Sequence, residues 1–224
     1  GDDEGLMPDI DLANVACGFH ASDPDHMRAT VRLAKRHGVK VGAHPSYPDL
    51  QGFGRRYMRM TREELVNHMI YQVGALAGFL KAEGMELSHI KPHGALAGAA
   101  TREEEVAHAV CDVADIFKVP LMALPGDFSR TIYAARGHVV WNEFYADLPY
   151  DDAGHIVITR KHDPVDPADT ARRVRRAIAE GKTESMSGKD VPVLIESICV
   201  HSDTPNAVEV ARAVRDALKT PVAA

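Results

Sequence analysis

Short apolar runs alternate with amphipathic helical patterns along the 224 residues of this chain, and no other feature constrains the fold as strongly. Chains in which strands and helices take turns form parallel βαβ units with right-handed crossovers. The sequence therefore predicts an α/β fold, with strands expected at residues 10–16, 39–41, 87–90, 119–124, 139–144 and 193–200.

Helix boundaries are marked by capping residues. Asp23 before Pro24 predicts a helix start, and Gly38 its end. Thr61 with Glu64 forms a capping-box pattern that opens a long helix ending near Gly84. A second such pattern, TREE at residues 101–104, predicts another helix. Further helices are expected at 130–136, 167–181 and 205–218, and the irregular stretch 149–167 is expected to hold a short strand at 155–159.

Histidines recur just after the predicted strands. They are His20, His44, His93 and His201, and Glu143 lies within the strand predicted at 139–144. In a (β/α) barrel the carboxyl ends of all strands meet at one face, where the catalytic groups gather. The pattern therefore favours a barrel over an open sheet, and it predicts an active site built from these five side chains.

Imidazoles beside a carboxylate act as general acids and bases or as ligands of a divalent metal. The spacing does not separate the two roles. If a metal is bound, His20, His44 and His93 are its expected ligands. Cys17 with His20 and Cys199 with His201 also resemble zinc-ligand pairs, although small cysteines beside strand ends more often fill core space.

Charged residues near these histidines are candidates for substrate binding. Lys91 is also a candidate catalytic residue, because the following Pro92 and Gly94 fix the backbone near it; it suits a substrate carboxylate, a phosphate or a catalytic acid. Arg55 with Arg56 forms a possible clamp for an anion. Asp49, Asp147 and Asp203 lie at turns, where an Asp either binds substrate or caps the turn.

Composition excludes several classes of partner. The net charge of −6 and a pI near 6.0 give no reason to expect nucleic acid or an anionic membrane. No apolar run approaches the roughly 18 residues that span a bilayer. Three scattered cysteines fit a reducing compartment rather than a disulfide framework. We therefore expect a cytoplasmic protein with one domain over residues 1–224.

Several motifs together resemble the LamB/YcsF family, and they run nearly end to end in family order. The matching stretches are NVACGFHASDP at 14–24, GAHPSYPD at 42–49, GFGR at 52–55, YQVGAL at 71–76, KPHGAL at 91–96, Glu143 with Ala146 and Asp147, and HSD at 201–203. The resemblance implies a seven-stranded TIM-like barrel of the glycoside hydrolase/deacetylase type. It also places Asn14 and Asp23 among the substrate-binding residues.

The resemblance further implies a function. The family is associated with the A subunit of an ATP-dependent 5-oxoprolinase, which cleaves the lactam 5-oxo-L-proline to L-glutamate together with subunits B and C. ATP, accompanied by Mg²⁺, is the implied cofactor. Phosphorylation of the lactam oxygen would activate the ring carbon toward water.

The chain departs from the family pattern at four places. Family members open with an acidic first strand of the type DLNxDxGE, which is missing here, so we expect an upstream segment outside this sequence. The Tyr and Asn that usually follow KPHGAL are Ala97 and Gly98, the Arg after Ala146 and Asp147 is Leu148, and the Gly of HGD is Ser202. The substrate consequently stays open.

The sequence leaves two alternative functions open. One is a divalent-metal-dependent deacetylase or amide hydrolase that needs no ATP. The other is a non-catalytic subunit that binds a lactam for a partner protein.

Overall fold

A computed structural model describes residues 1–124, 126–157 and 163–219. The chain divides into two compact units. The major unit is the continuous stretch 11–141, and the minor unit combines residues 1–10 with 142–224. Each unit is described by itself below.

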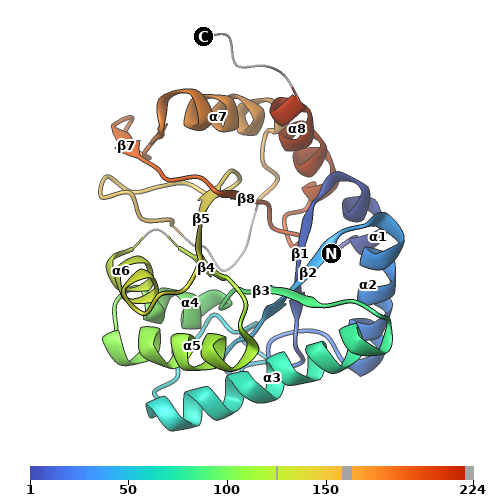
Figure 1. The fold of residues 1–224 in the computed structure, drawn as a ribbon. Helices are drawn as coiled ribbons and strands as arrows, with labels where there is room; N and C mark the ends of the chain where they lie inside the picture. The colour runs from blue at the N-terminus through green and yellow to red at the C-terminus, as the bar shows by residue number, and fades with distance from the viewer. Residues whose placement is uncertain (125, 158–162, 220–224) are drawn as a thin grey trace. The chain divides into compact units, whose positions relative to one another are not determined.

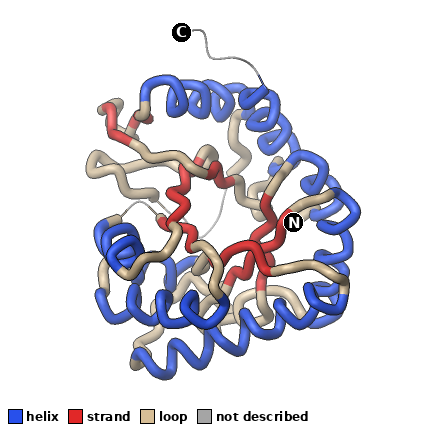
Figure 2. The backbone as a smooth tube through the Cα atoms, in the orientation of Figure 1, coloured by secondary structure: helices blue, strands red, loops and turns tan. Residues whose placement is uncertain are grey.

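The major unit is built on parallel strands in the order β1 (Leu12–Ala16), β2 (Lys40–His44), β3 (Leu87–Ile90) and β4 (Leu121–Ala123). Helices lie along the outside of these strands (Figure 2). The register pairs Ala16 with His44 and Ala43 with Ile90, so β1, β2 and β3 end at similar heights. The predicted α/β class and parallel pairing are confirmed, and the strand ends deliver their loops to one edge.

The helices of the major unit follow their sequence signals. They are α2 (Pro24–His37), α3 (Arg62–Ala82), α4 (Gly94–Ala100), α5 (Glu104–Phe117) and α6 (Asp127–Ala135). Asp23 caps α2 by accepting a hydrogen bond from the His26 N–H, and Gly38 ends it with a φ of 70°. The capping box between Thr61 and Glu64 is present at the start of α3. These predicted boundaries are confirmed.

The second predicted capping box is wrong. The Thr101 hydroxyl donates to the carbonyl oxygen of Gly98, which ends α4, a short helix that the sequence did not predict. Helix α5 therefore starts at Glu104 after Glu103, without a side-chain cap. A threonine whose hydroxyl finishes one helix is not available to begin the next.

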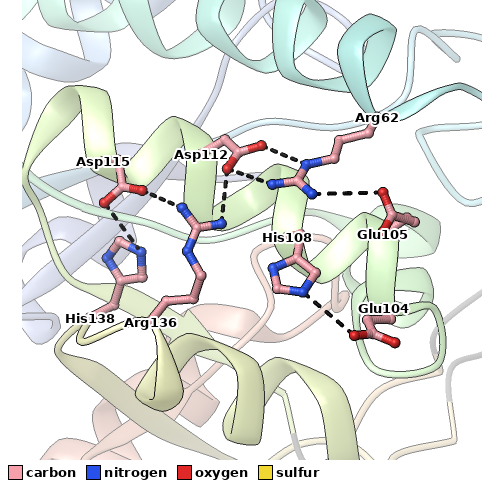
Figure 3. Close-up of polar contacts among 8 residues, drawn as sticks. All are labelled: Arg62, Glu104, Glu105, His108, Asp112, Asp115, Arg136 and His138. Atoms are coloured by element: carbon pink, nitrogen blue, oxygen red, sulfur yellow. Dashed lines mark hydrogen bonds and ion pairs between the residues drawn. The ribbon is translucent and has the colours of Figure 1, made fainter.

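Charged side chains join three helical segments of the major unit (Figure 3). Asp112 on α5 accepts hydrogen bonds from Arg62 on α3 at 2.7 and 2.8 Å and from Arg136 after α6 at 2.9 Å. Asp115 pairs with Arg136 and lies 3.7 Å from His138. The network fixes α3 and α6 to α5.

In the minor unit, residues 143–145 of β5 (Val140–Tyr145) pair in parallel with β8 (Ser197–Cys199), and Tyr145 lies opposite Cys199. Helices α7 (Pro167–Glu180) and α8 (Ala207–Lys219) lie side by side (Figure 1). The first residues form α1 (Asp3–Leu6) and the 3-10 turn η1 (Met7–Asp9). Leu6 packs on Ala207 and Ala211 of α8, with Val200 and Val208 beside them.

The strand expected at 193–200 is shorter than predicted. Residues Asp190–Pro192 form β7, which pairs antiparallel with β6 (Lys182–Glu184), and only Ser197–Cys199 joins β5. In the described part of the strand expected at 155–159, Ile156 forms an isolated bridge with Tyr150; residues 158–162 lie outside the described part. None of the described helices is long and apolar enough to cross a membrane.

Candidate functional site

Three of the predicted histidines meet at the strand ends of the major unit. His44 ends β2, while His20 and His93 follow β1 and β3. The His20 and His93 rings stack with centroids 3.8 Å apart and an interplanar angle of 7°. The His44 ring lies edge-on to both, at 5.6 Å from His20 and 4.8 Å from His93. The prediction that His20, His44 and His93 lie together is therefore confirmed.

The loop 49–56 packs against this cluster at Phe53 and Gly54. Phe53 has a φ of 53° and Gly54 a φ of 64°, both in the left-handed region. A Cβ on Gly54 would lie 2.7 Å from His93 Cδ2 and 2.9 Å from His20 Cβ. The Gly54 carbonyl accepts a hydrogen bond from Ala95 N at 2.9 Å. Only a residue without a side chain allows the loop this close to the imidazoles.

Backbone carbonyls fix the hydrogen positions on two of the rings. His93 Nε2 lies 2.7 Å from the Phe53 oxygen, and His44 Nδ1 lies 2.6 Å from the Lys91 oxygen. Carbonyl oxygens only accept, so both of these nitrogens carry a hydrogen. The remaining nitrogens, His44 Nε2 and His93 Nδ1, face each other at 3.1 Å.

This arrangement creates a place for one further proton. With both rings neutral, two lone pairs face each other between His44 and His93. A proton between them would form an N–H···N hydrogen bond and give the pair one positive charge. The pair is therefore a base that can accept one proton.

Burial favours the uncharged form of His20 and of His44. It lowers the pKa of His20 to about 3, with the positive charges of His93 and Arg55 acting in the same direction. Burial also lowers the pKa of His44 well below its usual value, assisted by His93 and Lys91. Lys91 is itself buried, at 6% exposure, and contributes a positive charge to the site.

The expected metal ligands His20, His44 and His93 lie together. One ring nitrogen of His44 and one of His93 face backbone carbonyls, and the other two nitrogens face each other. His20 Nδ1 is buried and has no hydrogen-bond partner among the described residues. Among those same residues, no group of three His, Cys, Asp or Glu side chains is placed to hold a metal.

Asn14 supports the sheet below the cluster. Its side-chain oxygen lies 2.8 Å from Nε2 of His89, a fully buried histidine of β3. Burial, with the positive charge of Lys91 as a smaller cause, lowers the pKa of His89 to about 3. A Cβ on Gly42 would lie 2.1 Å from the same ring nitrogen. Asn14 thus positions a buried imidazole, a contact that the sequence prediction missed.

The other predicted binding residues of the major unit have different surroundings. Asp23 is exposed and caps α2. Asp49 is buried and accepts hydrogen bonds from Gly52 N at 3.0 Å and from the Arg56 side chain, so it holds loop 49–56 together. The hydrogen bond from Arg56 lowers the pKa of the Asp49 carboxyl. Arg55 lies over the Phe53 ring at 5.0 Å, on the loop that covers the histidines.

The minor unit contains a second polar cluster at the ends of β5 and β8. The buried Asp147 carboxylate accepts hydrogen bonds from His201 N at 2.7 Å and from His201 Nδ1 at 3.0 Å. The Tyr145 hydroxyl donates to Glu143 at 3.0 Å, and its ring stacks on His201 with centroids 5.8 Å apart. The structure thus brings the predicted residues Glu143, Asp147 and His201 together, whereas Asp203 lies exposed in the following turn.

The pKa of Asp147 and the pKa of His201 shift in opposite directions. Burial raises the pKa of Asp147, but the hydrogen bonds from His201 outweigh it and the pKa is lowered. Burial likewise lowers the pKa of His201, but Cys199 and Asp147 outweigh it and the pKa lies well above its usual value.

Tyr145 and Tyr150 were missed by the sequence prediction; the Tyr150 hydroxyl accepts from Tyr145 N at 2.8 Å.

Known proteins resemble the chain over nearly all its length. The model of the LamB/YcsF family matches residues 1–223. The chain is 43% identical to a protein of Pseudomonas aeruginosa named as a 5-oxoprolinase A subunit, over 98% of this chain and 88% of that protein. It is 47% identical to the lactam utilization protein lamB of Emericella nidulans, over 96% of this chain and 86% of that protein.

A solved structure confirms the fold. The crystal structure of the lactam utilization protein from Thermus thermophilus matches with a TM-score of 0.88 and 43% identity, over 98% of this chain and 89% of that chain. The motifs, the family match and this structural match agree. The chain belongs to the LamB/YcsF family.

Proposed function

We propose that this chain is the A subunit of an ATP-dependent 5-oxoprolinase, which opens the lactam ring of 5-oxo-L-proline to give L-glutamate. The cluster of His20, His44 and His93 is the observation that carries the proposal, because opening a lactam with water needs a group that takes up and returns protons. Relatives of 43–47% identity that are named as 5-oxoprolinase A subunits or as a lactam utilization protein support the substrate.

The chemistry divides between ATP and the chain. A five-membered lactam is a stable amide, and ATP supplies phosphorylation of its oxygen, which activates the ring carbon. The residues of the chain bind the ring, exclude bulk water and handle protons. The His44 and His93 pair accepts the proton released when water attacks, because its two facing lone pairs are held 3.1 Å apart by backbone carbonyls at both ends.

Positive side chains near the pair bind the anionic groups. Lys91 is buried beside His44, and Arg55 lies on the loop over His93. A buried ammonium group attracts the substrate carboxylate or a phosphate strongly, because the interior screens charges less than water does. Lys91 and Arg55 are therefore proposed as the anion-binding residues of the major unit.

The proposal includes partner subunits. Several relatives carry the letter A in their subunit names, which implies an assembly of several chains. We propose subunits B and C as the partners, with ATP and Mg²⁺ as the nucleotide pair and the cytoplasm as the place of work. No observation on the described residues favours the metal-dependent hydrolase or a purely binding role.

The deciding experiment measures glutamate formation from 5-oxoproline and ATP, with the purified chain alone and with subunits B and C added. We expect turnover that requires all three chains, ATP and Mg²⁺. If the full assembly opens other lactams but leaves 5-oxoproline intact, the substrate assignment is wrong. If it opens no lactam at all, the proposed function is wrong.

A further inference from the structure

Gln72 is a fully buried polar side chain of α3 that the sequence did not identify as a site residue. Its amide oxygen accepts a hydrogen bond from the Ser46 backbone N–H at 2.9 Å, and its amide nitrogen donates to the Ser46 carbonyl oxygen at 2.9 Å. The amide nitrogen also donates to the His68 carbonyl oxygen at 3.0 Å. This orientation pairs the amide oxygen with an N–H and the amide nitrogen with two carbonyls, so both of its hydrogens are used.

The partner of Gln72 lies just beyond the end of a strand. Strand β2 ends at His44, so the backbone groups of Ser46 follow it by two positions. Ser46 is fully buried, and buried backbone N–H and C=O groups need partners. The Gln72 amide supplies both partners, as a neighbouring strand would. It thus fixes the backbone immediately after the strand.

The peptide unit between Pro45 and Ser46 links Gln72 to the histidine pair. This unit is trans, and the C=O and N–H of a planar trans peptide point in opposite directions. The Ser46 N–H donates to Gln72, whereas the Pro45 C=O accepts a hydrogen bond from the His93 backbone N–H at 2.8 Å. One planar unit is therefore held by α3 on one side and by His93 on the other. A rotation of this unit would disturb both hydrogen bonds.

The same peptide unit determines where the two imidazoles meet. His44 is bonded covalently to Pro45, and the backbone of His93 is hydrogen-bonded to the Pro45 oxygen. The ring nitrogens that face each other, His44 Nε2 and His93 Nδ1, lie 3.1 Å apart. A hydrogen bond weakens steeply when its geometry is lost, so a small shift of the unit changes how well the pair can hold a proton.

We propose that Gln72 is a positioning residue for the His44 and His93 pair. It acts through the peptide unit between Pro45 and Ser46, which it holds in the orientation that keeps the two ring nitrogens facing each other. The placement of the rings is a property of the folded chain. Its effect on catalysis rests on the proposed function.

Two substitutions of similar length separate positioning from packing. Gln72→Met fills similar space but forms none of the three hydrogen bonds. Gln72→Glu keeps an oxygen that accepts from the Ser46 N–H, and so keeps the hydrogen bond on the peptide unit shared with His93. Positioning predicts that Gln72→Glu retains the geometry of the pair better than Gln72→Met does. Packing alone predicts the reverse, because a carboxyl group costs more to bury than a thioether.

NMR of the purified chain with isotopically labelled histidine reads the geometry directly. Ring nitrogens with and without a hydrogen have distinct chemical shifts, and His44→Gln and His93→Gln identify the signals. We expect one tautomer for each ring, with the hydrogen on Nδ1 of His44 and on Nε2 of His93. Gln72→Met should mix the tautomers, whereas Gln72→Glu should keep them. Asn67→Met replaces an exposed amide of α3 and is the matched control, which should give the wild-type signals.

Turnover by the assembled enzyme is the second measurement. Gln72→Met should lower kcat by about 10²-fold, the cost of misplacing a catalytic group by about 1 Å. KM should stay nearly unchanged, because Lys91 and Arg55 remain in place to bind the substrate. Gln72→Glu should lose less activity than Gln72→Met, and Asn67→Met should lose none.

Melting curves verify that each variant is folded. The proposal is overturned if folded Gln72→Met keeps the wild-type tautomers, or if Gln72→Glu mixes them. If Gln72→Met does not fold, the signals of Gln72→Glu decide alone: single tautomers support the proposal and mixed ones refute it. An assembly that opens no lactam would refute the proposed function, but the ring signals need no substrate, ATP or partner and would still test the role of Gln72.

Discussion

We expect catalysis at the candidate site to require both His93 and Lys91. His93→Ala removes the proton acceptor that faces His44, and Lys91→Ala removes the buried charge beside it. We expect either change to lower kcat of the assembled enzyme by about 10²–10⁴-fold, the range typical of lost acid–base catalysis. His37→Ala, at the exposed end of α2, is the control and should retain full activity. Wild-type turnover in a folded His93→Ala or Lys91→Ala chain would remove that residue from the site.

Gly42 has no room for an added methyl group. Its added Cβ would lie 2.1 to 2.3 Å from three atoms of the buried His89 ring, which Asn14 holds in place. We predict that Gly42→Ala lowers the free energy of unfolding by about 1–3 kcal/mol or more, as expected of an overpacked interior. Gly74→Ala is the matched control on α3, where a Cβ meets nothing within 4 Å. It should stabilise the chain by about 0.5–1 kcal/mol, because Ala favours a helix.

Urea denaturation of the two glycine variants measures both changes. Both variants add one methyl group, but we predict that Gly42→Ala lowers the free energy of unfolding and that Gly74→Ala raises it. Equal effects at Gly42 and Gly74 would contradict the contact between Gly42 and His89.

The Asp112 carboxylate holds helix α5 to its neighbours through hydrogen bonds from Arg62 and Arg136. Hydrogen bonds from Arg62 lower the pKa of Asp112, and those from Arg136 add to the effect. A carboxyl whose pKa is lower in the folded state stabilises the fold above its unfolded pKa of about 3.9, and this stabilisation is lost as the pH falls through the folded value. Asp112→Asn should therefore be destabilised by about 1–2 kcal/mol at neutral pH, in the range of hydrogen bonds to charged groups.

The difference between wild type and Asp112→Asn should shrink as the pH falls below about 4, and it should also shrink at high salt, because part of the network is exposed. Thermal melts across this pH range measure it. A difference that is constant with pH would assign the effect to the shape of the side chain rather than to its charge.

Elements with local signals were predictable from the sequence. Asp23 with Gly38 bounded α2 correctly, and Thr61 with Glu64 began α3, because these caps depend on residues three or four positions apart. Helix α4 was missed because it has seven residues, and its Ala95 N–H bonds to Gly54, about forty residues away. The meeting of the histidines could be predicted because each follows a parallel strand. Which ring nitrogens carry a hydrogen could not, because this depends on the Phe53 carbonyl, and positive φ angles in the loop set the direction of that carbonyl.

The whole molecule consists of two units, and the minor one is assembled from both ends of the chain. Leu6, 8% exposed, packs on Ala207 and Ala211 of α8. We predict that Leu6→Ala lowers the free energy of unfolding by about 2–3 kcal/mol, through lost burial and the cavity left behind. Ile116→Ala, where the side chain is 55% exposed, should change it by less than about 0.5 kcal/mol. Denaturation followed by circular dichroism compares the two, and equal losses would contradict the packing of Leu6.

The contact between Leu6 and α8 also determines when the minor unit can form during translation. Residues 11–141 form one continuous unit, so all of its partners are present once that stretch has left the ribosome. Leu6 is made before any of them, yet its partners Ala207 and Ala211 come just over two hundred residues later. During translation the earliest part of the minor unit therefore waits, with its apolar side chain uncovered, until the last helix emerges.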